Sequence, residues 1–333
     1  MLRVDLTGQE LSRLRIAERT DPLWETALSL HLLQSRDTTL VFEPWRREVA
    51  ESLRRAGLLP ATRALMHLCP AASYFPDFLT PGCGDADLDT ALERIMATPR
   101  RRLLAELTRL YHRSRTPVPR GVRLLAQGRP EALARLGRWV RDYYTIAVEP
   151  YTAAIRAEAA VDRAVRAEAV LHRGTEGLLT GFGAQPGWRY ESGTLRTPYP
   201  LKRELRLHGR VLTLVPAFFC VRAPLALVDE TLPQVLVYPL SPAPGWLERS
   251  RHGGPASCAA QLIGASRARL LELLDGPMTT TGMAAALDLA PSTTSRHLSV
   301  LREAGLLVSR REGMHVLHHR TRLGEALLAG TVR

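Results

Sequence analysis

Apolar side chains recur at steps of three and four residues through most of the first 182 positions, which is the spacing of one buried face of an α-helix. Thr7 and Glu10 form a capping box, a pattern that marks a helix start, ahead of a short apolar stretch that includes Leu14. Pro22 stands where the next pattern begins, and proline is favoured in the first turn of a helix. The spacing therefore predicts a helical section over about half of the chain.

The longest helical pattern lies at residues 130–173 and contains Pro150, which should kink or split the helix because proline lacks an amide hydrogen. Ahead of this proline, one stripe of the helix is apolar and suits a partner helix. The stripe consists of Leu133, Leu136, Val140, Tyr143 and Ala147. We expect it to be a dimerisation surface, so that the protein is a homodimer.

The pattern changes at residues 188–238, where short runs rich in β-branched residues are bounded by glycine or proline. His208 and Gly209 lie between two such runs, in the position of a hairpin turn, so we expect a small antiparallel sheet. Residues 239–254 are rich in proline, glycine and serine, as linkers are. These changes predict a helical and mixed domain at 1–240, a linker at 241–257 and a second domain at 258–333.

The C-terminal domain shows helix signals in a fixed order. Thr279 supplies a cap for a short helix, and Pro291 opens a second helix after a three-residue turn. Gly305 is placed to end that helix, a hairpin is predicted at 306–318, and a last helix follows at 321–329. This is the order of a winged helix-turn-helix, whose second helix enters the DNA major groove. The predicted fold is mainly α, with an N-terminal helical domain that holds a small antiparallel β section and a C-terminal winged helix-turn-helix.

The stretch PSTTSRHLSVLREAGLLV at residues 291–308 resembles the recognition-helix block of ArsR-type transcriptional regulators, whose usual pattern is S-x-S-T-V-S-x-H-L-x-x-L-x-x-A-G-L-V. The resemblance covers the chain from residue 262 onward. The segments at residues 22–26 (PLWET) and 76–81 (PDFLTP) are similar to a domain of unknown function that precedes this wing in regulators from GC-rich bacteria. The resemblance implies a transcriptional regulator, more often a repressor, that binds a palindromic operator in double-stranded DNA as a homodimer.

Residues that reach base edges lie in the first two turns of such a helix. The candidates are Ser292, Thr293, Ser295 and Arg296. Arg296 can pair with guanine through two hydrogen bonds, and the hydroxyls can contact bases or phosphates. Arg310 and Arg311 near the hairpin tip are expected to contact phosphate. Two residues depart from the family pattern, since Ala290 cannot cap the helix and Met314 stands where such wings commonly carry arginine.

The net charge of +12 is compatible with a polyanionic partner but adds little to this interpretation. Of the 45 basic residues only Lys202 is a lysine, which indicates a codon bias towards arginine. Residues 262–333 contain nine arginines and six acidic residues, so most of the excess lies elsewhere. The chain has no apolar run of the length that a membrane helix needs and begins without a secretory signal, so we expect a cytoplasmic protein with no membrane partner.

No cofactor or metal is expected. The four cysteines are far apart in the sequence, and residues 282–287, the helix that carries metal-binding cysteines in many ArsR-type proteins, contain none. His318 and His319 lie in a predicted strand, where neighbouring side chains point to opposite faces. A signal, if one is sensed, is therefore predicted to be a small organic effector that binds in the N-terminal domain.

The sequence contains no G-x-S-x-G, H-E-x-x-H or P-loop motif, so we do not expect an enzyme. Two alternatives stay open. In the first, the protein is an enzyme that uses the winged helix only to dimerise. In the second, the winged helix contacts another protein. Binding to an operator would distinguish both alternatives from a DNA-binding regulator.

Overall fold

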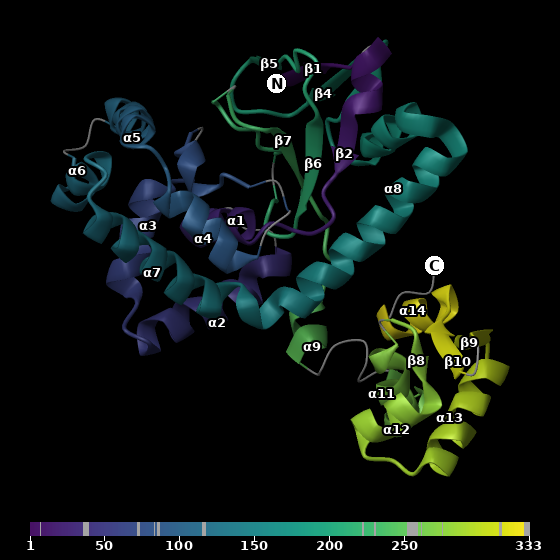
Figure 1. Cartoon of the computed structure of the whole chain (residues 1–333). Helices are drawn as coiled ribbons and strands as arrows, with labels where there is room; N and C mark the ends of the chain where they lie inside the picture. The colour runs from purple at the N-terminus through teal and green to yellow at the C-terminus, as the bar shows by residue number, and fades with distance from the viewer. Residues whose placement is uncertain are drawn as a thin grey trace. The chain divides into compact units, whose positions relative to one another are not determined.

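The computed structural model of the chain consists of two compact units, Met1–Pro244 and Gly245–Arg333, which are described separately (Figure 1). The predicted linker at 241–257 stays a prediction, and residues 252–257 of it lie outside the described residues. The structure describes residues 1–6, 8–35, 40–71, 74–82, 84, 87–114, 118–221, 223–229, 231–251, 259–260, 262–274, 276–312 and 315–329.

The N-terminal unit is built mainly of helices, as the sequence predicts. Pro22 occupies the first position of α1, and Pro150 separates α7 from α8 within a short 3₁₀ turn. Figure 1 shows the long helix α8 running from the other helices towards the sheets of this unit. The helices are α1 (Pro22–Gln34), α2 (Glu43–Arg55), α3 (Leu59–Leu68), α4 (Leu88–Met96), α5 (Arg100–Ser114), α6 (Arg120–Ala126), α7 (Pro130–Ala147) and α8 (Thr152–Gly181).

Helix α7 lies at the centre of this unit and contacts α1, α2, α3, α4 and α6. All five residues of its apolar stripe are buried by these neighbours. At its C-terminal end, the Tyr143 hydroxyl lies 3.0 Å from the Ser29 hydroxyl, and the Ala147 carbonyl accepts a hydrogen bond of 3.1 Å from the Trp45 indole. The prediction that this stripe is a dimerisation surface is therefore wrong, because helices of the same chain already cover it.

Two sheets accompany the helices. One is wholly parallel, in the order β2-β6-β7, and consists of β2 (Leu14–Ile16), β6 (Leu212–Ala217) and β7 (Gln234–Pro239). The other has the order β3-β4-β1-β5, with only the β1–β5 pair parallel, and consists of β1 (Leu2–Asp5), β3 (Arg189–Glu191), β4 (Thr194–Thr197) and β5 (Arg203–Leu205).

This arrangement corrects two predictions about the N-terminal unit. Residues 14–16 form a strand rather than part of a capped helix, and Thr7 itself lies outside the described residues. His208 and Gly209 do form a turn with positive φ angles, but the strands on either side, β5 and β6, belong to different sheets. The section at 188–238 is therefore not one antiparallel sheet. Every residue of β6 is buried, which is typical of a parallel sheet covered on both faces.

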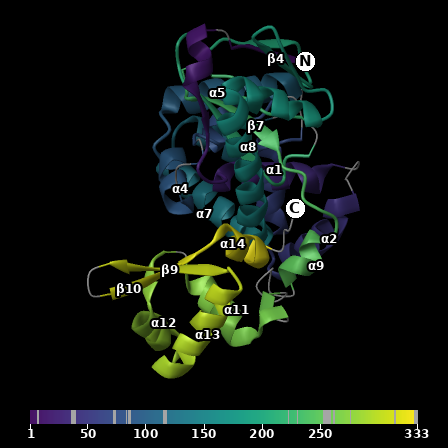
Figure 2. The same cartoon turned by 90° about the vertical axis from the view of Figure 1, so that its right-hand side faces the viewer.

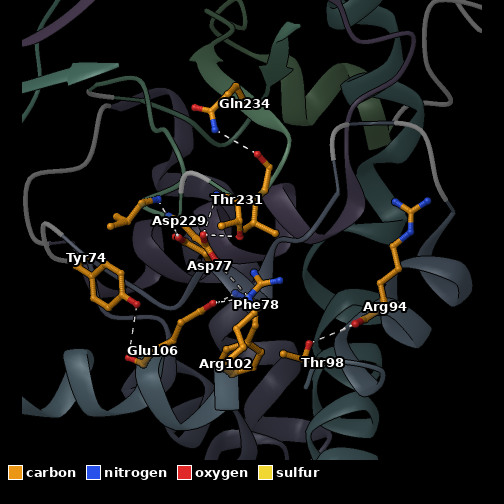
Figure 3. A network of polar contacts seen from close by, with 12 residues as sticks. Tyr74, Asp77, Phe78, Arg94, Thr98, Arg102, Glu106, Asp229, Thr231 and Gln234 are labelled. Carbon is orange, nitrogen blue, oxygen red and sulfur yellow. Dashed lines mark hydrogen bonds and ion pairs between the residues drawn. The ribbon is translucent and has the colours of Figure 1, made fainter. Parts of the chain in front are cut away.

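A network of buried carboxyl groups holds the PDFLTP segment in place (Figure 3). The Asp77 carboxylate accepts hydrogen bonds from the backbone amides of Val228 and Asp229, at 2.8 and 2.6 Å. Glu106 of α5 accepts one from the Phe78 amide, at 2.8 Å, and another from the Arg102 guanidinium, at 2.6 Å. Burial raises the pKa of Asp77 to about 6. These bonds join the PDFLTP segment both to α5 and to residues 228–229, which follow about 150 residues later in the chain.

Glu25 of the PLWET segment is a second buried carboxyl group, on α1, that binds a distant part of the backbone. Its side chain is 2% exposed, and its two oxygens accept hydrogen bonds from the Phe218 and Phe219 amides, at 2.8 and 3.1 Å. Burial raises the pKa of Glu25 to about 8, against the opposing effect of these two amides. The carboxyl group thus fixes α1 against the residues that directly follow β6.

We expect the Glu25→Gln variant to change how stability depends on pH. Between about pH 4.5 and 8 the folded protein keeps a proton on Glu25 that the unfolded chain releases, so wild-type stability falls as pH rises, by at most about 1.4 kcal/mol per pH unit. Glutamine does not titrate. Urea unfolding from pH 5 to pH 8 should therefore show the stability advantage of the wild type shrinking with pH. A constant or growing advantage would contradict the raised pKa.

The C-terminal unit has the predicted order of a winged helix-turn-helix. In Figure 2 the β9–β10 hairpin extends from the unit, and α12 and α13 pack beside each other. A three-stranded antiparallel sheet, in the order β8-β10-β9, completes it. The elements are α11 (Ala265–Leu273), β8 (Met278–Thr279), α12 (Thr280–Leu287), α13 (Pro291–Glu303), β9 (Leu307–Glu312), β10 (His315–Arg320) and α14 (Arg322–Ala329).

One apolar core holds these elements together. Its buried residues are Leu270, Leu271, Leu274, Met283, Leu298, Leu301, Leu306 and Leu307, which come from α11, α12, α13 and the start of β9. The fold of the whole chain is mainly α with a C-terminal helix-turn-helix, which confirms the predicted fold class. Across the described part of the chain, no helix combines the length and the apolar character needed to cross a membrane.

Candidate DNA-binding site

The turn between α12 and α13 is fixed by local backbone chemistry. The Thr279 hydroxyl accepts a hydrogen bond of 3.1 Å from the Gly282 amide and so caps α12. Asp288 ends that helix with a φ of 52°, in the left-handed region that aspartate tolerates better than most residues. Ala290 then takes the N-cap position of α13, where no side chain bonds the free amides, and Pro291 begins the helix. The predicted weakness at this cap is confirmed.

We expect Ala290→Ser to stabilise the C-terminal unit by about 1 kcal/mol, because Ala290 already has the extended backbone of an N-cap and serine adds an acceptor for the first-turn amides. Hydrogen exchange of the α13 amides should slow accordingly. A matched control is Ala285→Ser on the exposed side of α12, where serine caps nothing and should cost a few tenths of a kcal/mol. Equal or opposite effects at the two positions would contradict the capping argument.

The inner face of α13 anchors it in the unit. Thr294 is fully buried and its hydroxyl donates a hydrogen bond of 3.2 Å to the Ala290 carbonyl. Leu298 and Leu301 follow on the same face and belong to the core, while His297 is half-buried. Thr294 and His297 thus lie on the inner side of the helix. With this face held, the opposite face of the helix is presented to solvent.

All four predicted recognition residues on α13 are exposed. At 100° per residue, Ser292 and Arg296 lie together opposite the buried face, while Thr293 and Ser295 lie to either side of them. Ser299 continues the row formed by Ser292 and Arg296 and is half-buried. It was not among the predicted residues, although its i+3 spacing from Arg296 was a usable signal. Whether any of these residues contacts DNA stays a prediction.

Acidic Glu303 continues the same row at the C-terminal end of α13. A carboxylate there repels phosphate, whereas the N-terminal end of the helix carries partial positive charge and free amides that attract it. The electrostatics therefore favour contact through the first two turns of α13, which is where the predicted residues lie.

The two arginines predicted for the wing point in different directions. Both are exposed on β9, where Arg310 pairs with Leu317 and Arg311 with Val316. Because neighbouring residues of a strand point to opposite faces, Arg311 shares the face of Ser309, and Arg310 lies on the other face. The face of Ser309 is the one that meets α12, through His318 and Thr280. Whether either arginine contacts phosphate stays a prediction. Gly313 and Met314 lie outside the described residues.

His318 of β10 connects the β9–β10 hairpin to α12. Its Nδ1 lies 2.9 Å from the Ser309 hydroxyl and its Nε2 lies 2.9 Å from the Thr280 hydroxyl of α12. Burial lowers the pKa of His318, and nearby Arg302 and His319 lower it further. The ring is therefore neutral near pH 7, and both of its nitrogens lie within hydrogen-bonding distance of hydroxyl groups.

Two of the four cysteines lie in the described part of the chain. Cys69 and Cys220 are buried in the N-terminal unit, where burial strongly raises the pKa of both thiols. Cys83 and Cys258 lie outside the described residues. Among the residues that the structure does describe, no three histidine, cysteine or acidic side chains are grouped as metal ligands would be.

The match to a known protein family lies within the C-terminal unit. A family model described as a helix-turn-helix domain matches residues 265–310, which run from α11 into β9. No curated protein and no solved structure shows significant similarity to the chain. Residues 265–310 are therefore a helix-turn-helix domain, and this domain points to DNA as the partner and to regulation of transcription as the role.

Proposed function

We propose that the protein is a sequence-specific DNA-binding regulator of transcription, acting as a repressor in the cytoplasm. The observation that carries the proposal is the exposed face of α13, where Ser292 and Arg296 stand at the end of the helix that attracts phosphate. A guanidinium in this position can pair with guanine in the major groove. The helix-turn-helix domain also favours a regulator over an enzyme.

The direct test is selection of bound duplexes from a random pool by the full-length protein, followed by footprinting on the DNA upstream of its own gene. We expect a palindromic consensus site and protection at a matching position upstream. Affinity for that site should fall with rising salt, as phosphate contacts require. A pool that shows no enrichment would contradict the proposal and would favour the alternative in which the winged helix contacts protein.

We propose further that the protein binds this site as a homodimer. Two recognition helices related by a two-fold axis, about 34 Å apart, meet successive major grooves on one face of the duplex. Light scattering should give twice the mass of one chain for the purified protein alone, and two chains plus one duplex for the complex. A single chain per duplex at micromolar concentration would contradict the dimer. The surface involved cannot be the apolar stripe of α7, which is covered within the chain.

The sign of regulation follows from a reporter placed behind the selected site. Expression should fall when the protein is present and recover when Arg296 is replaced by alanine.

We also propose that a small organic effector controls binding. Its support is the amount of structure in the N-terminal unit beyond what a DNA-binding domain requires, including the cavity described next.

A further inference from the structure

A cavity of about 630 Å³ opens in the N-terminal unit. It lies among the segment that precedes α1, the starts of α1, α4 and α8, and the C-terminal end of α7. A volume of this size is within the range that small organic ligands occupy. The cavity is formed wholly within residues 18–163, so it belongs to one unit of the chain.

Three helices begin at this cavity. Pro22, Leu88 and Thr152 are the first residues of α1, α4 and α8, and all three line it. A helix carries partial positive charge at its N-terminus, and a carboxylate that caps the helix offsets this charge. Aspartate side chains cap α1 and α4, but no side chain caps α8.

Side-chain charges add to this effect. Arg19, Arg156 and Arg163 line the cavity, and only Arg163 makes a hydrogen bond, to the Glu18 carbonyl, among the described residues. The acidic residues of the lining are already engaged. Asp87 caps α4, and Glu18 forms an ion pair of 3.5 Å with Arg15.

The third acidic residue of the lining is Glu25. Its two oxygens accept hydrogen bonds from the backbone amides of Phe218 and Phe219. The lining therefore carries the guanidinium charges of Arg19, Arg156 and Arg163. Against them stands the carboxylate of Asp87, since Glu18 is paired with Arg15 and burial raises the pKa of Glu25 to about 8. The lining keeps a net positive charge.

The remaining wall is apolar. Val148 from the end of α7 and Ile155 and Ala159 from α8 are buried side chains that line the cavity. The ring of Tyr144 lines it as well, and the charge of Arg156 acts on the hydroxyl of that tyrosine. The lining of the cavity therefore combines aliphatic and aromatic side chains with arginines.

We infer that this cavity binds an amphipathic organic anion, whose charged head meets the arginines and whose apolar body lies along the aliphatic wall. Guanidinium groups suit a carboxylate, sulfonate or phosphate head because they offer paired hydrogen-bond donors. The inference rests on the proposed function only in making this anion the effector. The binding step itself is independent of DNA.

The test measures binding of the fluorescent anion anilinonaphthalene sulfonate to the full-length protein without DNA. Octanoate should displace the probe, whereas octanol and octylamine at the same concentration should not. Arg156→Gln should weaken probe binding about tenfold or more, the loss expected for one charged hydrogen bond. Ala160→Phe, which fills the cavity from an exposed position of α8, should weaken it as well.

The matched control is Arg173→Gln, an exposed arginine on the same helix that does not line the cavity. Its affinity for the probe should equal that of the wild type, and circular dichroism should show all variants folded. Displacement by octanol as effective as by octanoate, unchanged binding by Arg156→Gln and Ala160→Phe, or no probe binding would each overturn the inference. If the probe binds as expected but random-pool selection fails, the cavity stands and the proposed regulatory function falls.

Discussion

Replacing Arg296 by alanine should strongly reduce the protein's preference for its operator while leaving the fold intact. The side chain is exposed in the second turn of α13, opposite the buried face, so the folded state loses no packing. A guanidinium that pairs with guanine through two hydrogen bonds contributes about 1–3 kcal/mol of discrimination against the wrong base. Affinities for the selected duplex and for a scrambled duplex, measured at one salt concentration, should converge.

The control for this variant is Arg322→Ala, which removes an equal charge from an exposed position at the start of α14. It should lower both affinities slightly and keep their ratio, because loss of a distant charge acts on all sequences alike. If Arg296→Ala behaves in the same way as this control, Arg296 does not read bases.

Leu301→Ala should unfold the C-terminal unit and leave the N-terminal unit folded. Leu301 is 1% exposed and lies in the core formed by α11, α12, α13 and β9. Truncating a buried leucine costs about 2–5 kcal/mol, a large part of the stability of a unit this small. Calorimetry should show one transition lost or moved to lower temperature while a second is unchanged, and DNA binding should disappear.

The neighbouring variant Val300→Ala provides the matched control, since Val300 is 38% exposed on the other side of α13. It removes a similar amount of apolar surface outside the core, so its effect on stability should be within about 0.5 kcal/mol. A shared shift of both transitions in Leu301→Ala would show that the two units unfold together.

The C-terminal unit could be predicted closely because its signals are local. Pro291, Gly305 and the Thr279 cap each act within a few residues, and the structure shows a helix start, a helix end and a capped turn at these positions. The exposed positions of Ser292, Thr293, Ser295 and Arg296 on α13 are consistent with helical spacing.

The sheets of the N-terminal unit could not be predicted in the same way. Strand β2 has three residues, too few to distinguish a strand from one turn of a helix. Strand β6 is buried on both faces and so shows no alternation of apolar and polar residues. The stripe of α7 showed that this face is buried but could not show what buries it.

The buried acidic residues were missed for a different reason. Glu25 and Asp77 lie in the two segments that carry the N-terminal resemblance. Nothing in their local sequence pattern reveals that each carboxyl group accepts hydrogen bonds from two backbone amides of a distant segment. Such bonds depend on the tertiary fold. Buried carboxyl groups of this kind can be recognised only once the burial and the backbone donors are known.

The parallel pairing of β2 with β6 has a consequence for biosynthesis. Leu14 pairs with Leu212, so the sheet cannot form until most of the chain has left the ribosome. At usual rates of translation the first strands wait roughly 10–40 s for their partners. A nascent chain that stops before β7 leaves an apolar strand edge exposed, whereas one that ends at Pro244 contains every strand of both sheets. Translational pauses before β7 has left the ribosome should therefore favour chaperone capture, and pauses after residue 244 has left it should not.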